Sequence, residues 1–449
     1  MELDLISGLT NVLAATDHAP LDMGIRLRLS VMNFLEFAVW GAWFVVLGQY
    51  LNVLKFTGKQ IGSIYATMSL GSIFTPIIVG AVADKYFPGE YVMAASHFIG
   101  AGLLYAMAFA RTPGKFYLLA LAYALVYSPT LSVSNAVIFA NIPDAQRDFP
   151  TIRVLGTIGW IAANLMLKVL LKPGESVNNR PLLLASALSA VLGAFSFQLP
   201  HTPPGNKADL FPFVQAFELL SDKSFAVFFG ISFLITIALA FYYSFTSLYL
   251  EQKIRVQPGN VGPLMTIGQW SEIVFLLALP WFLETFGMKS VLVVGMAAWG
   301  LRYAIFSAGG PFPLILLGLA LHGICFDFFF AAGFIYVEKT APEAIRNSGQ
   351  ALFSSLTYGL GMYLGTEASG WINHYFTREN PDPSTGLAVR TTDWSKFWMI
   401  PCVGVVVSLV LFLALFSPSA KKPNEKPVDK AALSVGPAAI EMARHEAAR

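Results

Sequence analysis

Long apolar runs separated by short polar or charged breaks occupy almost the whole chain from residue 27 to residue 417. Crossing a bilayer core of about 30 Å takes about 20 helical residues. Unpaired backbone groups are costly in lipid, so runs of this length fold as transmembrane helices. The sequence therefore predicts an all-α membrane protein with twelve transmembrane helices, at approximately 27–53, 60–83, 91–110, 116–139, 150–171, 181–199, 223–250, 262–285, 289–308, 312–337, 344–375 and 394–417.

Composition supports a membrane protein and argues against several other classes. The chain is 55% hydrophobic and 12% charged, about half the charged fraction of an average soluble protein. Its net charge of +2 favours neither nucleic acid nor an acidic partner. The two cysteines lie far apart in apolar runs and the six histidines are scattered, so we expect no disulfide, metal site or cofactor. The sequence has no nucleophile elbow or phosphate-binding glycine loop, which argues against an enzyme.

The longest internal break, residues 200–222, divides the spans into two sets of six. We expect residues 26–199 and 223–417 to form two pseudo-symmetric six-helix bundles. Residues 1–25 are predicted to be a dispensable N-terminal extension, and residues 418–449 a disordered tail.

The linker between the bundles has its own pattern. Apolar residues recur there at helical spacing, which predicts a short helix at the membrane surface; a plain disordered linker is the alternative. These residues are Leu210, Phe213, Val214, Phe217 and Leu220.

The start of the chain and its orientation stay open at the level of sequence. Basic residues of an amphipathic segment follow Met23, which makes this methionine a candidate for the true start. The Lys and Arg residues near the predicted loops favour neither orientation under the positive-inside rule.

Two short matches relate the predicted bundles to each other. The second span ends with Gly80-Ala-Val-Ala-Asp84, and the eighth ends with Pro280-Trp-Phe-Leu-Glu284, which puts an acid at the same point 200 residues later. The fifth span opens with Arg153-x-x-Gly156 and the eleventh with Arg346-x-x-Gly349, 193 residues later. The similar offsets and the matching ranks of the spans support an internal repeat.

Glu272 is the only charged residue between Val256 and Leu283. A carboxylate inside a span is costly, and such groups usually face the protein interior or a water-filled path. Gln269 lies three residues earlier on the same helical face. We interpret Glu272 as a group that handles both a solute and protons, because it accepts hydrogen bonds when ionised and donates one when protonated. The alternative is a neutral glutamic acid that hydrogen-bonds between helices.

A second polar strip lies on the predicted fifth span. Arg153, Thr157 and Trp160 are spaced at i, i+4 and i+7, so they share one helical face. The cost of an arginine inside a membrane favours a role for this strip in a central cavity. The alternative is a surface ion pair between Arg153 and Asp148 or Asp144.

Asp327 lies within a run of phenylalanines in the predicted tenth span. Apolar surroundings favour its protonated form unless a cation pairs with it, and Arg302 of the preceding span is the candidate partner. Asp327 is therefore either a proton site and conformational switch or half of a static ion pair. His322, one turn before Phe326, is either a solute contact or a satisfied interior histidine.

Glu36 in the first span is a second candidate proton carrier. The neighbouring Trp40 and Trp43 offer flat surfaces on which a nucleobase could stack. Tryptophan is also common at membrane interfaces and at helix contacts. Tyr242 and Tyr243 of the seventh span carry the same two interpretations.

Four motifs together point to a known group of membrane proteins. Gly80-x-x-x-Asp84-Lys85 resembles the loop motif of the major facilitator superfamily. More specific are Phe34-Leu-Glu-Phe-Ala-Val-Trp40-Gly-Ala-Trp43, Asp148-Phe-Pro-Thr-Ile-Arg153-Val-Leu-Gly-Thr157-Ile-Gly, and Phe326-Asp327-Phe-Phe with Val337-Glu338-Lys339. With them the chain, from about Gly24 to Phe416, resembles the nucleoside:proton symporter family of that superfamily. The resemblance implies twelve helices, alternating access and proton-coupled uptake of nucleosides.

The residue patterns and the resemblance together predict roles for individual residues. The expected solute contacts are Arg153, Thr157, Trp160, Gln269, Glu272, His322, Phe326 and Tyr243. Proton coupling is expected at Glu272, Asp327 and Glu36, and gating at Asp84, Lys85, Glu338 and Arg346. The seventh span departs from the best-known member, because Ala240 and Tyr243 stand where that protein has two amide side chains, and His322 replaces a tyrosine in the tenth span.

These departures leave the solute open. The leading expectation is a nucleoside carried with protons through a bacterial inner membrane, by a monomer surrounded by lipid and with no nucleic acid partner. A sugar or another small polar solute is the alternative within the same fold. A receptor or assembly protein that transports nothing is a further alternative, and it predicts intramembrane charges locked in static pairs.

Overall fold

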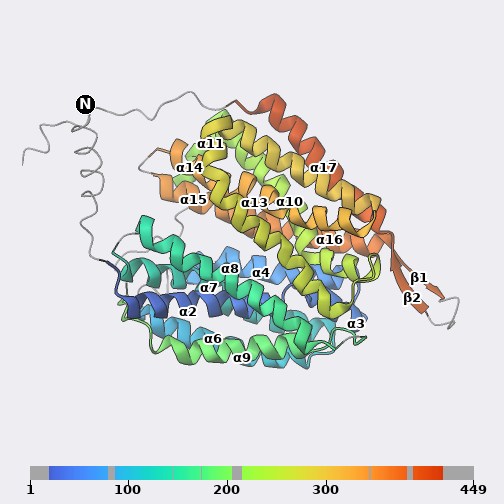
Figure 1. The fold of residues 1–449 in the computed structure, drawn as a ribbon, viewed down its shortest axis with the longest axis horizontal. Coiled ribbons are helices and arrows are strands. Elements are labelled where there is room, and N and C mark those ends of the chain that lie inside the picture. Colours follow the sequence, from blue (N-terminus) through green and yellow to red (C-terminus); the bar gives the residue numbers. More distant parts are fainter. Residues whose placement is uncertain are drawn as a thin grey trace, which may run out of the picture.

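The protein is described by a computed structural model for residues 20–78, 86–143, 145–172, 174–204, 215–342, 345–381 and 388–417. Helices α2 to α9 form one layer and α10 to α17 form a second layer beside it, and a β-hairpin projects from one end (Figure 1). This arrangement confirms the predicted fold of two bundles with six spans each.

The first layer, called the N-terminal half below, carries the first six spans. The first span consists of two helices, because a turn at residues 42–46 interrupts it. The Asp22 carboxylate caps its start by accepting a hydrogen bond of 2.9 Å from the backbone N–H of Ile25. The helices are α2 (Met23–Gly41), α3 (Leu47–Val53), α4 (Gly58–Ile78), α6 (Gly89–Ala108), α7 (Pro113–Asn141), α8 (Ala145–Leu170) and α9 (Arg180–Ser196).

The second layer, the C-terminal half, carries the last six spans. Its elements are α10 (Lys223–Gln252), α11 (Pro258–Ala308), α12 (Phe312–Ala320), α13 (His322–Phe326), η3 (Asp327–Ala331), α14 (Ala332–Thr340), α15 (Arg346–Ser354), η5 (Ser355–Gly361), α16 (Met362–Phe376) and α17 (Trp394–Leu415). Two predicted spans run together in α11, and Gly287 separates them with a φ of 76°, a conformation that favours glycine. The π-helical segments η3 and η5 interrupt the tenth and eleventh spans.

Length and hydropathy of the described helices agree with membrane insertion. Seven helical stretches in the described part of the chain are long and apolar enough to cross a bilayer, and one of them, α11, contains two spans. Large apolar side chains on their outer faces are exposed, among them Leu277, Val169 and Leu118. Lipid is the solvent that such faces require.

Two local elements lie outside the twelve spans. The linker contains a short 3₁₀ helix, η2 (Gln215–Ser221), in the segment where a short helix was predicted, and its place at the membrane surface stays a prediction. Leu219 of η2 is buried, whereas Phe217 of the predicted apolar face is 52% exposed. The predicted positions Leu210, Phe213 and Val214 lie outside the described residues. The loop before the last span forms an antiparallel hairpin of β1 (Thr377–Pro381) and β2 (Ala388–Thr392), which was not predicted.

The two halves are joined toward one end of the molecule, the hairpin end, where α3, α10 and α16 finish and the hairpin projects. Every hydrogen bond recorded between described residues of the two halves lies on that side. These bonds are Gln49 Nε2 to Glu251 Oε2 at 2.8 Å, Ser63 Oγ to Glu367 Oε2 at 2.9 Å, and Arg390 Nη1 to the carbonyl oxygens of Lys55 at 2.9 Å and Phe56 at 3.3 Å. The described structure is therefore closed at the hairpin end.

Glycines allow α4 and α16 to touch at this closure. A methyl group on Gly62 would lie 2.5 Å from the carbonyl oxygen of Thr366 and 2.7 Å from Cα of Gly370. The Lys59 ammonium lies 3.4 Å from the ring centroid of Trp371 across the same contact. Backbone contact this close leaves no room for solvent between the two helices.

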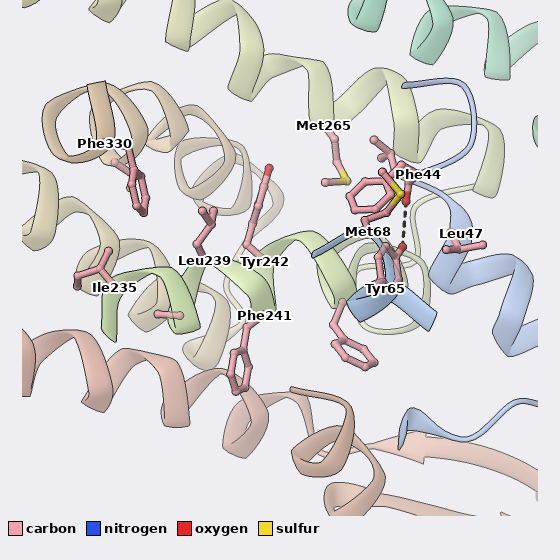
Figure 2. Close-up of a cluster of buried hydrophobic side chains, with 14 of the residues drawn as sticks. Phe44, Leu47, Tyr65, Met68, Ile235, Leu239, Phe241, Tyr242, Met265 and Phe330 are labelled. Atoms are coloured by element: carbon pink, nitrogen blue, oxygen red, sulfur yellow. Dashed lines mark hydrogen bonds between the residues drawn. The ribbon is translucent and has the colours of Figure 1, made fainter. Parts of the chain in front are cut away.

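A buried apolar cluster continues the contact toward the centre of the molecule. Phe44 and Tyr65 of the N-terminal half lie near Met265 of the C-terminal half (Figure 2). Tyr242, on α10, belongs to the same cluster and lies further from them. The Tyr65 hydroxyl donates a hydrogen bond of 3.0 Å to the carbonyl oxygen of Phe44. This bond holds the interrupted first span against α4.

Candidate functional site

Aromatic side chains from both halves meet where α2 and α8 face α10. The rings of Trp40 and Trp160 pack edge to face with centroids 5.4 Å apart, and Phe44 lies 6.5 Å from Trp160. Tyr243 of α10 reaches across to Phe44 at 6.4 Å. Trp160 and Tyr243 are both half-buried, so each keeps part of its surface free for another flat group.

Arg153 lies on α8 one turn before Thr157, so the predicted strip is helical. Its guanidinium carbon lies 4.1 Å above the ring centroid of Phe37. The alternative from the sequence was an ion pair with Asp148 or Asp144. No salt bridge joins Arg153 to another described residue, and Asp144 lies outside the described residues. Arg153 is thus a half-buried cation that lies over the ring of Phe37. Glu272 of the other half is the carboxylate within electrostatic range of it.

Glu272 lies on the first span of α11, one turn after Gln269, and both side chains are half-buried. No hydrogen bond or ion pair from the Glu272 carboxylate to another described residue is recorded. Arg153, Tyr243 and Tyr358 are within electrostatic range of it, although Arg153 lies beyond ion-pair distance. Arg153 and Glu272 therefore lie in different halves, within electrostatic range but further apart than a direct ion pair.

Arg302 makes no ion pair with Asp327 in the described structure, which speaks against the static pair that was one of the two interpretations of Asp327. The guanidinium Nη1 lies 3.0 Å from Nδ1 of His322, and the guanidinium carbon lies 3.5 Å from the ring centroid of Tyr242. The position of Arg302 along α11 brings it level with α13, which ends before Asp327 begins the π-helical segment η3. His322 stacks on Tyr242 with centroids 5.1 Å apart and meets Tyr243 edge to face at 6.3 Å.

Asp327 is 1% exposed, and its Oδ2 has no hydrogen-bond partner in the described structure. Glu272 lies within electrostatic range of it. The neighbouring Phe326 is half-buried and packs against His322 and Phe330. Asp327 begins a π-helical segment, and such segments are frequent at functional sites because they turn side chains away from regular helical positions.

Glu36 lies inside the N-terminal half and is fully buried. Its Oε2 is 2.8 Å from Nε2 of His97, and its Oε1 accepts a hydrogen bond of 2.6 Å from the Thr130 hydroxyl. The other ring nitrogen of His97 lies 3.2 Å from the Ser189 hydroxyl. The structure therefore gives Glu36 a basic neighbour that the sequence did not indicate, and its role in proton coupling stays a prediction.

Comparison with known proteins agrees with this geometry. A family model described as "Nucleoside H+ symporter" matches residues 23–421. The chain belongs to the nucleoside H+ symporter family.

Individual relatives of this family are similar over nearly their whole lengths. YegT of Escherichia coli (strain K12) is 40% identical over 91% of this chain and 97% of its own length. Nucleoside permease NupG of the same strain is 34% identical over 88% of this chain and 96% of its own. The crystal structure of nucleoside transporter NupG superposes with a TM-score of 0.77 at 33% identity, and it covers 88% of this chain and 99% of that one. The chain is therefore a transporter with the major facilitator fold.

Within this transporter, the residues predicted to form a gate are only partly described. Asp84, Lys85 and the side chain of Arg346 lie outside the described residues. Glu338 is exposed and accepts a hydrogen bond of 3.1 Å from Gln350 Nε2. Glu338 lies at the end opposite the hairpin, where no hydrogen bond joins described residues of the two halves.

The closure at the hairpin end was missed by the sequence analysis. Its polar residues Gln49, Ser63, Glu251, Glu367 and Arg390 lie near the ends of spans, where charges cost little and carry no signal on their own. Their pairing across the two halves depends on the three-dimensional fold.

Proposed function

We propose that this transporter carries a nucleoside together with protons across the bacterial inner membrane by alternating access. The observation that supports this most strongly is a cation and a carboxylate within electrostatic range across the two halves, Arg153 on α8 and Glu272 on α11, neither of them in an ion pair with another described residue. Keeping such groups inside a membrane protein is expensive unless they are used. They lie between the two halves, where the solute sites of such transporters occur.

The groups around these charges match the chemistry of a nucleoside. Ribose hydroxyls and base edges offer donors and acceptors, which suit Thr157, Gln269 and the two charges. The base is a flat aromatic ring, and the half-buried faces of Trp160, Tyr243 and Phe326 are suited to stacking. We assign the solute to the space between these two sets, with His322 as a further polar contact.

Proton coupling is assigned to Glu272 and Asp327, which lie within electrostatic range of each other. Solute binding at Glu272 changes which proton occupancy is favoured there, because an ionised carboxylate accepts from hydroxyls whereas a protonated one also donates. Glu36, hydrogen-bonded to His97, is proposed as a second proton-accepting group within the N-terminal half.

The structure is closed at the hairpin end, so the transport cycle must open it. Alternating access then consists of breaking the contact between α4 and α16 while the opposite end closes. Asp84, Lys85, Glu338 and Arg346 are proposed to form that opposite gate. We propose that a monomer surrounded by lipid performs the cycle, without nucleic acid.

A sugar or another small polar solute remains the second candidate because the seventh span lacks the expected amides. The two residues that replace these amides, Ala240 and Tyr243, have different surroundings. Ala240 is fully buried, and a methyl group on Gly365 would lie 2.6 Å from its Cβ, so Ala240 packs between α10 and α16. Tyr243 is the departure that reaches the contact between the halves.

A competition experiment separates these two solutes. Cells that express the transporter take up radiolabelled uridine, and unlabelled uridine, adenosine, ribose and maltose are added in excess. We expect both nucleosides to reduce uptake by more than 80% and both sugars to leave it unchanged, with Arg153→Gln as the inactive control. Competition by ribose or maltose as strong as that by adenosine would reject the nucleoside assignment.

A further inference from the structure

Arg302 is a fully buried cation for which no carboxylate partner is recorded in the described structure. Its Nε and Nη2 atoms are buried without hydrogen-bond partners there. A buried charge without an anion is costly. Its surroundings are aromatic, with Tyr242 at 3.5 Å, Trp299 at 5.4 Å and Phe306 at 5.7 Å from the guanidinium carbon to each ring centroid. The hydrogen bond to His322, at 3.0 Å, is its best-defined polar contact; Tyr242 and Cys325 are further polar neighbours.

This bond determines the chemical form of His322. A guanidinium group has only N–H donors and stays protonated in proteins. Since Nη1 of Arg302 lies 3.0 Å from Nδ1 of His322, Nδ1 must accept and therefore carries no proton. The proton of the neutral ring is then on Nε2. Protonating Nδ1 would turn the contact into two donors facing each other and would place two positive charges side by side.

Other groups near His322 leave this conclusion unchanged. Tyr242 and Tyr243 of α10 contact the ring through their aromatic faces and edges. The ring also packs against Gly268 of α11, one residue before Gln269. The titratable or charged groups that contact the ring are Arg302 on α11 and Tyr242 and Tyr243 on α10. Glu272 lies on α11 one turn after Gly268, and Cys325 and Asp327 follow His322 on its own span.

We infer that Arg302 is a positioning residue that fixes His322 as a neutral, permanent Nε2–H donor to an acceptor atom of the solute. No hydrogen bond of Nε2 to another described residue is recorded, so this donor is free to serve the solute. The acceptors that fit are a carbonyl oxygen or ring nitrogen of the nucleobase, or a ribose oxygen. His322 then takes no part in carrying protons, which leaves that task to the carboxylates. This inference rests on the proposed function, and it adds that the site contains a fixed hydrogen-bond donor that is distinct from the groups that handle protons.

The tautomer is measured directly by solution NMR on transporter labelled with ¹⁵N-histidine, without any solute. The signals of His322 are assigned by their loss in His322→Gln. We expect wild type to show an unprotonated Nδ1 and a protonated Nε2 at every pH between 5.5 and 8.0. A protonated Nδ1, or a ring that takes up a second proton in this range, would overturn the inference even if nucleoside transport is established.

Uridine binding to purified transporter provides the second test, with Arg302→Met as an uncharged variant of similar length. Without Arg302, His322 can take up a proton between about pH 5 and 8, and the resulting imidazolium competes with uridine for Glu272. We expect the ratio of the Kd of Arg302→Met to that of wild type to rise at least threefold between pH 8.0 and pH 5.5. Arg302→Lys keeps a donor and a charge and should stay within twofold of wild type at both pH values.

The double variant Arg302→Met/His322→Gln distinguishes positioning from a general structural effect. In the His322→Gln background, loss of Arg302 should change the Kd by less than twofold, and equally at both pH values. An equal loss of affinity in both backgrounds, independent of pH, would show that Arg302 only supports packing and would refute the inference. Wild type that binds no uridine would instead refute the proposed function, while the NMR result would still stand.

Discussion

The contact between α4 and α16 gives the sharpest prediction about the conformational cycle. Gly62→Ala adds a methyl group 2.5 Å from the carbonyl oxygen of Thr366 and 2.7 Å from Cα of Gly370. Since atoms in good contact are about 3.5 Å apart, the two helices must separate by about 1 Å. The adjacent hydrogen bond from Ser63 to Glu367, now 2.9 Å, would then be stretched beyond its useful range.

The energetic cost falls on the state that is closed at the hairpin end. Overpacking costs about 1–3 kcal/mol, and the lost hydrogen bond adds about 1 kcal/mol. The open state separates these helices and carries neither penalty. A difference of about 2–4 kcal/mol shifts the equilibrium toward the open state by about 30-fold to 900-fold.

Spin labels at the hairpin end measure this shift. Lys115 at the start of α7 and Lys396 at the start of α17 are exposed, and the native Cys325 and Cys402 are buried. Cysteines introduced at the two lysines and labelled for pulsed EPR should show a longer distance in Gly62→Ala, with slower uridine uptake. Gly102→Ala is the matched control, because nothing lies within 4 Å of the methyl group added there. An unchanged distance in Gly62→Ala, or an equal change in the control, would refute this reasoning.

Two further predictions concern groups outside the central site. Arg390→Gln removes the hydrogen bonds from the hairpin to the carbonyl oxygens of Lys55 and Phe56, so the distance between the spin labels should lengthen, but less than in Gly62→Ala. The control is Arg378→Gln, which removes the same charge from an exposed position and should leave the distance unchanged. Glu36→Gln keeps the shape of the buried side chain but not its charge, so the number of protons moved per uridine should fall while the Kd for uridine stays within twofold of wild type. An unchanged number of protons per uridine would make Glu36 a structural residue.

The fold was predictable because its signals are physical and repeated along the chain. Apolar runs of membrane length fix the spans, and the isolated Glu272 stands out because charge inside a span is rare. Arg153, Thr157 and Trp160 were predicted to share a face by helical spacing alone, and α8 confirms that they lie on one helix. That Arg153 comes within electrostatic range of Glu272 could be seen only once the two halves were placed against each other.

A sequence does not show how far along the membrane normal each helix lies, or how it is rotated against its neighbours. The features that were not predicted share this cause. Arg302 was a candidate partner of Asp327, but a π-helical segment begins at Asp327 and Arg302 lies level with His322. The hairpin at 377–392 was missed because its two strands have five residues each and little apolar alternation. Likewise His97 gave no sign that it would reach Glu36 on another span.

Proton movement driven by solute tests the central claim most directly. Transporter is reconstituted in vesicles that contain a pH-sensitive dye, and uridine is added without a membrane potential or a preset pH gradient. Wild type should acidify the lumen in step with uridine entry, and Glu272→Gln should bind uridine but move no protons with it. Uridine transport by wild type without proton movement, or unchanged proton movement in Glu272→Gln, would contradict the account.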